Sequence, residues 1–338
     1  MKNPFAPLII LLFTVFSSFA QSRTTLLHNG TSSFFLGATQ FTDAYNAAVI
    51  GDTILLPAGE VSPPQYINKR LNIFGVGFHP DSSAATGITK VTNNITLQED
   101  ADSIFFQGLH VNGSITGAFN HVVDYLRVSR CLTTGLIVPG SSTQSSQHAY
   151  ISESVILGNV TLNYAQNSDI TNCFIQSKIN AGNNNAIQNC IILNDGSNDN
   201  ITGASYCYFA NNILNRAYRR VPYGIDYNTF EKNVFVQAIS EQAFGTNTET
   251  DNWFNVDLTS FFVNQSGTKF NFSHNYHLNS PASYLGTDGT QVGIYGGAHP
   301  VKPGWIPIIP HITLKNIDNR TDNAGNLNVE FKVSAQDY

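Results

Sequence analysis

Hydrophobic and polar positions return in one short pattern along the middle of the chain. An apolar residue is followed by two further residues, a small or polar residue, one more residue and a second, mostly apolar residue. The clearest copies are Ile170–Ile175, Ile187–Ile192 and Phe230–Phe235. The central position of the seven copies holds Gly108, Cys131, Ser154, Cys173, Cys190, Asn212 and Asn233. A unit that recurs about every twenty residues is typical of a solenoid.

The columns of this repeat separate a buried side from an exposed side. The residue three places before the centre is always apolar, from Phe105 to Phe230, and the residue two places after it is mostly apolar, with His110 as the first member. We expect both columns to face inward. The residue just before the centre is polar in all seven copies, which are Gln107, Arg130, Glu153, Asn172, Asn189, Asn211 and Lys232. We interpret its asparagines as a ladder of amides that hydrogen-bond along the stack.

The residue types favour strands over helices. β-branched and aromatic residues fill the apolar columns, and Asn, Gly and Ser punctuate them. Leucine is too scarce for a leucine-rich repeat, which also needs a helical segment in each unit. We therefore predict an all-β fold, a parallel β-helix in which each coil contributes two or three short strands and stacks on the next at about 4.8 Å.

Both ends of the repeat region predict additional elements. Phe41, Ala44, Tyr45 and Ala48 lie on one face of a helix, which we expect to cap the first open layer of the solenoid. The pattern loosens after residue 236 and resumes at Phe272–His277, where the register would turn His277 inward. We expect the β-helix domain to span residues 21–299, a Pro-rich linker 300–310, and a C-terminal β-hairpin extension 311–338.

The first twenty residues have the features of a secretory signal peptide. Lys2 provides a positive start, Leu8–Phe16 is a short apolar run, and Ser18 and Ala20 precede a cut ahead of Gln21. The run is too short to cross a bilayer, and we expect no transmembrane segment elsewhere. The sequence therefore predicts an exported protein, secreted or held at the cell surface.

The segments that flank the repeats resemble those of a known superfamily. The run from the helix through Gly51–Glu60 to Asn68–Gly77 is similar to the opening of the pectin-lyase-like, right-handed parallel β-helix proteins. Tyr276–Ala282, Gly286–Gly289 and Val292–Gly297 resemble the closing segment of exported bacterial β-helix proteins. The resemblance implies a right-handed solenoid. It does not imply one activity, because the superfamily includes lyases, glycoside hydrolases and adhesins.

The charge of the chain limits the partners that it can bind, and its cysteines bear on disulfides and metal sites. Charged residues are 12% of the chain and the net charge is −6, which argues against nucleic acid as a partner. Cys173 and Cys190 share a column on successive coils, so their Cα atoms should lie about 4.8 Å apart. A buried ladder of these two thiols is favoured over a disulfide because stacked side chains run parallel, but a bridge between them is the alternative; Cys131 and Cys207 are the other two cysteines. No Cys/His spacing predicts a metal site.

One basic cluster is the candidate for chemistry. Lyases of the resembled fold remove the proton beside a uronate carboxylate with an Arg or Lys base, and the developing charge must be stabilised electrostatically. Arg220-Val-Pro222 faintly resembles the Arg-x-Pro segment of pectate lyases, although Ile225 stands where those enzymes have a second Arg. The candidate catalytic residues are Lys178, Arg216, Arg219 and Arg220, and the candidate substrate-binding residues are Asp195, Tyr218 and Trp253.

The repeat register would place Lys178, Asp195 and Arg216 on one outer face within about 10 Å. The alternative is a solvated turn in which the arginines cover Tyr218. No pair of aspartates stands out as a calcium site. We expect calcium as a cofactor only if the protein is a lyase. A hydrolase is less favoured, because it needs paired carboxylates and Asp195, Asp199 and Asp226 are isolated.

The composition favours binding over catalysis. Few titratable groups are paired, and a long stacked surface rich in Asn, Thr and aromatic residues suits a sugar chain, with Trp253, Phe254 and Tyr218 as possible stacking platforms. We therefore predict a monomeric protein without a cofactor that binds polysaccharide or a cell-surface glycan and has no assignable catalytic site. A lyase of uronate polysaccharide is the alternative.

Overall fold

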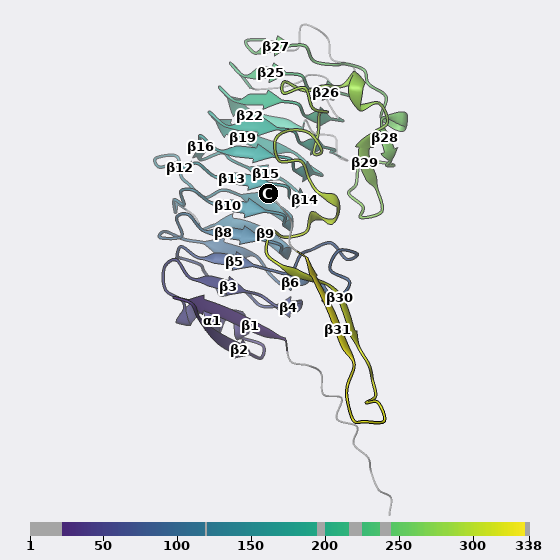
Figure 1. Ribbon diagram of the computed structural model, residues 1–338. Helices are drawn as coiled ribbons and strands as arrows, with labels where there is room; N and C mark the ends of the chain where they lie inside the picture. Colours follow the sequence, from purple (N-terminus) through teal and green to yellow (C-terminus); the bar gives the residue numbers. More distant parts are fainter. Residues whose placement is uncertain (1–21, 119, 195–199, 216–224, 237–244, 335–338) are drawn as a thin grey trace, which may run out of the picture.

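The chain winds into a stack of parallel β-coils. The computed structural model describes residues 22–118, 120–194, 200–215, 225–236 and 245–334. Across these ranges it is a mostly β structure, a parallel β-solenoid of about eight turns. Figure 1 shows the coils piled along one axis, with helix α1 (Gln40–Ala47) at the N-terminal end of the stack. The sequence-based prediction of a parallel β-solenoid is confirmed.

Two long sheets run along the stack. Within the described residues the first sheet has twelve strands in the order β2-β1-β3-β5-β8-β10-β13-β17-β20-β23-β25-β27, and it is parallel from β3 onward. Its strands are β1 (Arg23–His28), β2 (Thr31–Leu36), β3 (Thr53–Leu55), β5 (Asn72–Phe74), β8 (Phe105–Gln107), β10 (Arg127–Ser129), β13 (Tyr150–Ser152), β17 (Asp169–Thr171), β20 (Ala186–Gln188), β23 (Tyr208–Ala210), β25 (Thr229–Glu231) and β27 (Thr248–Thr250).

The second sheet has thirteen strands in the same ranges and faces the first across the core. Its strands are β4 (Gly59–Val61), β6 (Thr89–Val91), β7 (Ile95–Leu97), β9 (His110–Gly117), β11 (Leu132–Ile137), β14 (Val155–Ile156), β15 (Val160–Thr161), β18 (Phe174–Ile175), β19 (Ile179–Asn183), β21 (Ile191–Ile192), β22 (Ile201–Ser205), β24 (Ile213–Leu214) and β26 (Val234–Phe235). A small third ladder joins β12 (Ser146–Gln147) to β16 (Ala165–Gln166).

The inward columns form the core, as the repeat predicts. Val128, Ile151, Ile170 and Ile187 pair in register on successive strands and are fully buried. Further along the stack, the Phe209 and Phe230 rings lie parallel with centroids 4.8 Å apart. Burying side chains of this size stabilises the fold by about 1.5–3 kcal/mol each.

The first copy of the repeat is shifted by one residue from its predicted register. Val128 pairs with Phe106 and not with Phe105, and Thr133 pairs with Val111. His110 therefore pairs with Leu132, on the column that points away from the core, and the prediction of an inward His110 is wrong. The cause is the Phe105-Phe106 pair, because either residue satisfies an apolar position.

The polar column marks a backbone corner. In the first sheet, the residue that follows each strand from β8 to β25 has a left-handed conformation. We call this column of residues the trailing corner. Its members and their φ angles are Gly108 (70°), Arg130 (49°), Glu153 (46°), Asn172 (52°), Asn189 (51°), Asn211 (60°) and Lys232 (52°). Gly and Asn adopt this conformation most readily, so the tight corner explains why an apolar residue never appears here.

The asparagine ladder exists, but one position later than predicted. Asn212, Asn233 and Asn252 form it, inside the core. Asn233 Oδ1 accepts hydrogen bonds from both the backbone and the side-chain nitrogen of Asn212, and Asn252 Oδ1 accepts from Asn233 in the same way. The amides of Asn172 and Asn211 instead contact the C-terminal part of the chain, so the predicted axial ladder of Asn172, Asn189 and Asn211 is wrong.

The four cysteines are free and buried, which fits the thiol ladder of the sequence analysis. Cys131 donates to the backbone oxygen of Ser129 at 3.3 Å, and Cys173 and Cys190 donate in the same way to Thr171 and Gln188. Burial raises the pKa of the Cys131 thiol to about 12. The Cys131 thiol therefore acts as a small hydrophobic group and stays protonated at neutral pH.

Residues 253–308 form a covering segment that runs back along the outside of the second sheet. Six outward-facing residues of that sheet lie beneath it: Leu132, Val155, Phe174, Ile191, Ile213 and Val234. Phe174, for example, lies 4.9 Å from the ring of Tyr276 and 5.2 Å from that of Phe270. This second core was not predicted, and it buries the column of the second sheet that runs from Leu132 to Val234.

The covering segment does not continue the repeat. Its strands β28 (Phe262–Asn264) and β29 (Asn275–Leu278) pair antiparallel, and the 3-10 turns η2 (Leu258–Ser260), η3 (Pro281–Ser283) and η4 (Pro303–Trp305) connect its bends. The prediction that the pattern resumes at Phe272–His277 is wrong. His277 is exposed and stacks on Tyr295 with centroids 3.7 Å apart, so it does not point into the core.

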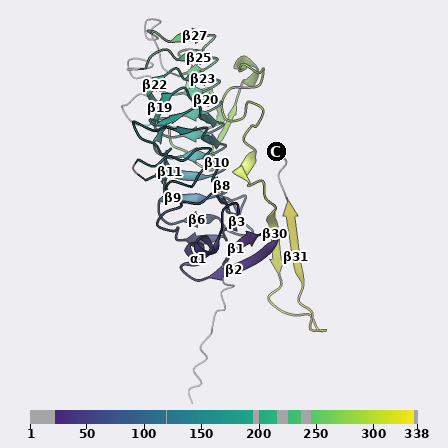
Figure 2. The same ribbon diagram turned by 90° about the vertical axis from the view of Figure 1, so that its left-hand side faces the viewer.

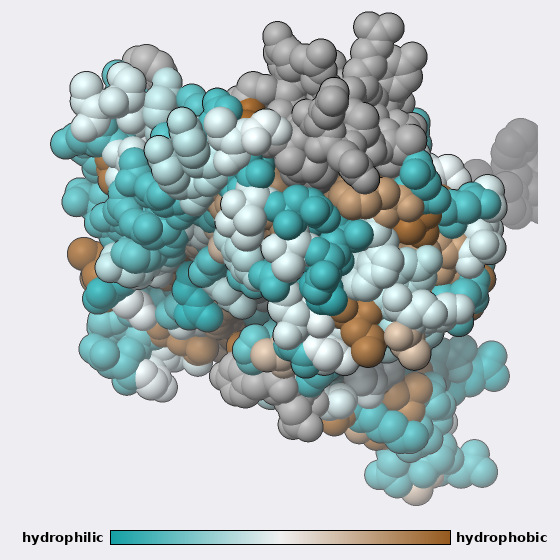
Figure 3. Space-filling view, turned by 90° about the horizontal axis from the view of Figure 1, so that it is seen from above, coloured by the Kyte–Doolittle hydropathy of each residue, from teal (hydrophilic) through white to brown (hydrophobic). Residues whose placement is uncertain are grey.

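The chain ends outside the stack. Strands β30 (His311–Ile317) and β31 (Val329–Ser334) form an antiparallel hairpin that stands apart from the coils (Figure 2). At the other end, α1 buries Phe41 and Ala44, as its apolar face predicts, beside the antiparallel β1–β2 pair. Seen along the stack, the described surface is mostly hydrophilic with small apolar patches (Figure 3).

Candidate functional site

Most of the predicted catalytic cluster cannot be placed. Arg216, Tyr218, Arg219, Arg220 and Asp195 lie outside the described residues. Lys178 is half-buried in the turn between β18 and β19, on the side of the second sheet.

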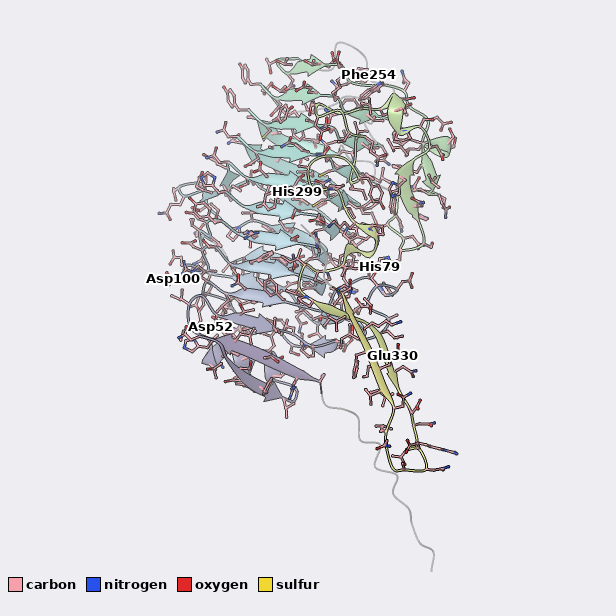
Figure 4. The ribbon with its side chains drawn as sticks, viewed as in Figure 1. Asp52, His79, Asp100, Phe254, His299 and Glu330 are labelled. Atoms are coloured by element: carbon pink, nitrogen blue, oxygen red, sulfur yellow. The ribbon has the colours of Figure 1, made fainter. Side chains whose placement is uncertain are left out.

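Trp253 belongs to the cover of the second core and is not an open platform. Its ring meets Tyr284 edge to face at 5.5 Å, and the amine of Lys232 lies 5.6 Å from its centroid. Phe254 is half-buried and packs against the core of the solenoid. Figure 4 shows Phe254 at the C-terminal end of the stack.

A cleft of about 200 Å³ lies on the outer face of the first sheet. Its floor is made by outward side chains of β8, β10 and β13, and its wall by the covering segment. Figure 4 shows His299 in this position, in front of the middle of the stack. The floor residues are Phe105, Gln107, Arg127, Ser129, Tyr150 and Ser152, and the wall residues are Ala298, His299, Pro300, Lys302 and Ile308.

Arg127 is the central charge of the floor. It pairs in register with Phe105 on one side and Tyr150 on the other, so the three side chains are neighbours in one column. Its guanidinium carbon lies 4.4 Å from the centroid of the Phe105 ring, a cation–π contact. The Arg127 side chain is exposed, and no carboxylate of the described residues lies within ion-pair distance of it. Its hydrogen-bond donors are therefore open to a ligand.

A buried ion pair fixes the wall to the floor. Arg130 Nε donates to Glu153 Oε2 at 2.9 Å and Nη2 donates to Oε1 at 3.3 Å, while Nη1 donates to the backbone oxygen of Ile306 at 2.8 Å. A second contact has the backbone nitrogen of Ile308 donating to Gln107 Oε1. Because both charged side chains are buried and fully engaged, they set the width of the cleft and are not available to a ligand.

The cleft is suited to binding more than to acid–base catalysis. Glu153 is its only carboxylate among the described lining residues, and it is committed to Arg130, whereas glycoside hydrolysis needs two. Burial, helped by the nearby Cys173 and Glu153, raises the pKa of Tyr150 and keeps its hydroxyl protonated, so that it offers no tyrosinate base at neutral pH. Hydroxyl and amide groups of Ser129, Ser152 and Gln107 can hydrogen-bond a sugar.

Two features are absent from the described residues. These residues contain no group of three or more His, Cys, Asp or Glu side chains arranged to hold a metal ion. In the same ranges, the helices are too short or too polar to cross a bilayer.

Sequence reasoning missed this cleft because its wall comes from far along the chain. Arg127 and Tyr150 lie one residue before the inward positions Val128 and Ile151, in a column that the pattern leaves unassigned, and Phe105 joins them only because the first copy is shifted by one residue. Their pairing follows from the repeat, but the position of His299 and Lys302 does not.

Comparisons with protein-family models, curated proteins and solved structures found no match to this chain. Its function has to be inferred from its own residues.

Proposed function

We propose that this protein is an exported binding protein whose cleft holds an acidic polysaccharide at the cell surface. The proposal includes the signal peptide at residues 1–20, a right-handed winding of the coils and a capping role for α1. The observation that carries it is the exposed Arg127 guanidinium, held over Phe105 without an ion-pair partner among the residues that the structure describes. A chain of net charge −6 that places such a cation in a hydroxyl-lined cleft offers a local site for an anion.

Uronate sugars match this chemistry. The Arg127 fork can hydrogen-bond a carboxylate with two parallel bonds. Tyr150 and Phe105 provide rings beside it, and Ser129 and Ser152 can accept or donate to sugar hydroxyls. The cleft lies on the first sheet, and outward residues of later strands, such as Thr171 and Gln188, are partly exposed, so a polymer could extend beyond the cleft along the stack.

Affinity electrophoresis in gels that contain polygalacturonate, alginate or a neutral dextran would test the proposal. We expect the acidic polymers to retard the wild-type protein and Arg127→Ala to weaken this binding by about tenfold or more, because a charged hydrogen bond contributes about 1.5–3 kcal/mol. Arg320→Ala, an exposed arginine in the C-terminal hairpin, is the matched control and should bind like the wild type. Equal retardation of the wild type and Arg127→Ala would contradict the proposal.

A polysaccharide lyase is the second candidate, because Arg127, His299 and Lys302 line one cleft. In that reading a cation neutralises the uronate carboxylate while a basic residue removes the neighbouring proton. Incubation with the same polyuronides, with and without calcium, would reveal it through the ultraviolet absorbance of the unsaturated product. Product formation that Arg127→Ala abolishes would make the cleft an active site, whereas binding without product would leave the protein a binder.

A further inference from the structure

A second corner of the stack holds aromatic side chains in a backbone conformation that disfavours them. We call it the leading corner, because each member lies two residues before a strand of the first sheet. All seven have positive φ: Ser103 (61°), Tyr125 (57°), His148 (58°), Asn167 (51°), Asn184 (56°), Tyr206 (56°) and Tyr227 (60°). Asn suits this left-handed region, whereas a bulky ring is an outlier there.

Burial does not explain the tyrosines. Tyr125, Tyr206 and Tyr227 are 52%, 63% and 58% exposed. The corner itself is held by backbone hydrogen bonds, such as that from Tyr125 N to the oxygen of Gln147, and Asn serves it equally well on two of the coils. A backbone outlier that gains little from packing points to a function of its side chain.

The rings are arranged in two stacked pairs along the edge of the solenoid. Tyr206 and Tyr227 are nearly parallel, at 10°, with centroids 5.3 Å apart, and Tyr125 and His148 are at 18° and 5.1 Å. Because ring planes touch at about 3.5 Å, a 5.3 Å separation requires a sideways offset of about 4 Å. Each ring therefore leaves part of its face uncovered, and the uncovered faces follow one another along the stack.

The described residues that precede the rings in the sequence are polar. The residues that immediately precede the corner are Asp102, Asp124, Gln147, Gln166, Asn183, Ser205 and Asp226. Three are carboxylates and four are neutral hydrogen-bonding groups. The edge lies on the side of β12 and β16 (Figure 1), where Figure 4 also shows Asp100, whereas the cleft opens in front of the strands. Among these seven described residues every charge is negative, so the edge and the cleft differ in the charge that they favour.

We propose that the leading corner is a second carbohydrate-binding site, which takes an extended chain of neutral pyranose sugars along the axis of the stack. Tyr206 and Tyr227 would stack against the C–H faces of the sugars, and amides such as those of Gln166 and Asn183 would hydrogen-bond their hydroxyls. Successive sugars of an extended chain are separated by about the length of one pyranose ring. This length is close to the spacing of about 4.8 Å between neighbouring coils. The proposal rests on residues outside the cleft and stands independently of the function proposed for it.

The double variant Tyr206→Asn/Tyr227→Asn tests the site without endangering the fold, because Asn already occupies two positions of the same corner. Affinity electrophoresis with hydroxyethylcellulose, xyloglucan and galactomannan would measure binding, and thermal unfolding would measure stability. We expect at least one polymer to bind the wild type and the variant to lose about tenfold in affinity or more. Its melting temperature should be equal or higher, since Asn relieves the left-handed strain.

Tyr66→Asn, which removes another exposed tyrosine outside the corner, should retain the binding. Binding of polygalacturonate should be unaffected by the double variant, so a failure at the edge is distinguishable from a failure at the cleft. The proposal is overturned if no neutral polymer binds the wild type, or if the double variant binds as tightly as the wild type does.

Discussion

At the scale of single residues, the trailing corner does more than turn the chain. Asn172 and Asn211 use the tight turn to direct their amides at the covering segment. Asn172 Nδ2 donates to the backbone oxygens of Ile294 at 3.0 Å and Gly296 at 2.8 Å, and Asn211 Oδ1 accepts from the backbone of Thr287. The repeat thus supplies, coil by coil, the contacts that hold a non-repetitive segment against it.

Asn172→Gly isolates this contribution, because Gly keeps the left-handed backbone at φ 52° and removes only the amide. We expect a loss of about 2 kcal/mol in the free energy of unfolding, since two buried carbonyl oxygens lose their donor. Urea unfolding would measure the loss.

Asn167→Gly is the matched control for this substitution. Asn167 has nearly the same φ, 51°, but its side chain is exposed, and its amide nitrogen donates to the side chain of Gln147 and not to the covering segment. Its replacement should change stability by about 0.5 kcal/mol or less. Equal losses in the two variants would show that the turn, and not the contact with the covering segment, carries the effect.

The one-residue error in the first coil shows what periodicity can resolve at this scale. The repeat predicts the inward columns from Val128 to Phe230 correctly, because in each of these copies one apolar residue is clearly larger or more hydrophobic than its two neighbours. Phe105 and Phe106 are both apolar and therefore leave the register open. Gly108 was the decisive signal, since a glycine in a column of left-handed residues fixes the corner and hence the register.

At the scale of elements, the asparagine ladder inside the core links the last coils. Asn233 Nδ2 donates to the backbone oxygen of Phe209 at 2.9 Å, while its Oδ1 accepts from the backbone of Asn212. These groups lie where no water can replace a lost partner, so the ladder connects coils that short strands alone join by few hydrogen bonds.

Asn233→Ala should lower the free energy of unfolding by about 3 kcal/mol, because it leaves a backbone donor and a backbone acceptor unsatisfied and opens a small cavity. Urea or thermal unfolding would measure the change. Asn316→Ala, in the exposed strand β30, is the control and should alter stability by about 0.5 kcal/mol or less. A loss at Asn233 as small as that of the control would mean that the ladder adds nothing to the stacking of the coils.

The repeat contains a signal for the second core that the predicted columns did not include. The position just after the centre is apolar in Leu132, Val155, Phe174, Ile191, Ile213 and Val234. Since the residue that follows points inward, strand alternation turns this column outward. A continuous apolar column on an outer face predicts a cover. Which segment provides the cover could not be predicted, because residues 253–308 have no repeat and the contacts span more than a hundred residues.

At the scale of the whole molecule, buried histidines make stability depend on pH. His79 lies under the covering segment, parallel to the Trp305 ring at 6.1 Å and edge-on to Phe272 at 4.9 Å. Burial lowers its pKa, and the opposing attraction of Asp81 is the smaller effect. Burial also lowers the pKa values of His110, His277 and His311, and a neighbouring lysine adds to the effect at His110.

A histidine with a lowered folded-state pKa is neutral in both states above its ordinary value of about 6.5. As the pH falls through that value the unfolded chain takes up the proton first, so stability should fall from pH 7 to pH 5. Burial raises the pKa of Asp169, so the folded chain takes up this proton first and Asp169 has the opposite effect on stability. That effect belongs to the lower pH range in which carboxyl groups titrate. Melting temperatures across this range would show the decline.

His79→Phe should make the decline shallower, because the ring contacts remain and one proton-binding group is removed. His299→Phe, at an exposed position in the covering segment, is the comparison variant. The interpretation fails if the melting temperature of His79→Phe falls as steeply with acid as that of the wild type.

The hairpin β30–β31 and the covering segment differ in what they contribute to the whole molecule. Every residue of β31 is exposed, and an isolated two-stranded hairpin is at most marginally stable in water. A chain that stops after Pro310 should therefore keep the melting temperature of the full chain and its binding at Arg127.

A chain that stops after Asn279 would lose the part of the covering segment that holds Val292, Ile294 and Trp305, and would expose the apolar column of the second sheet. It should unfold at a much lower temperature or aggregate, since each large apolar side chain left uncovered costs about 1.5–3 kcal/mol. Equal stability of the two truncated chains, measured by thermal unfolding, would show that the second core does not support the solenoid and that the cleft is walled by a segment the fold can do without.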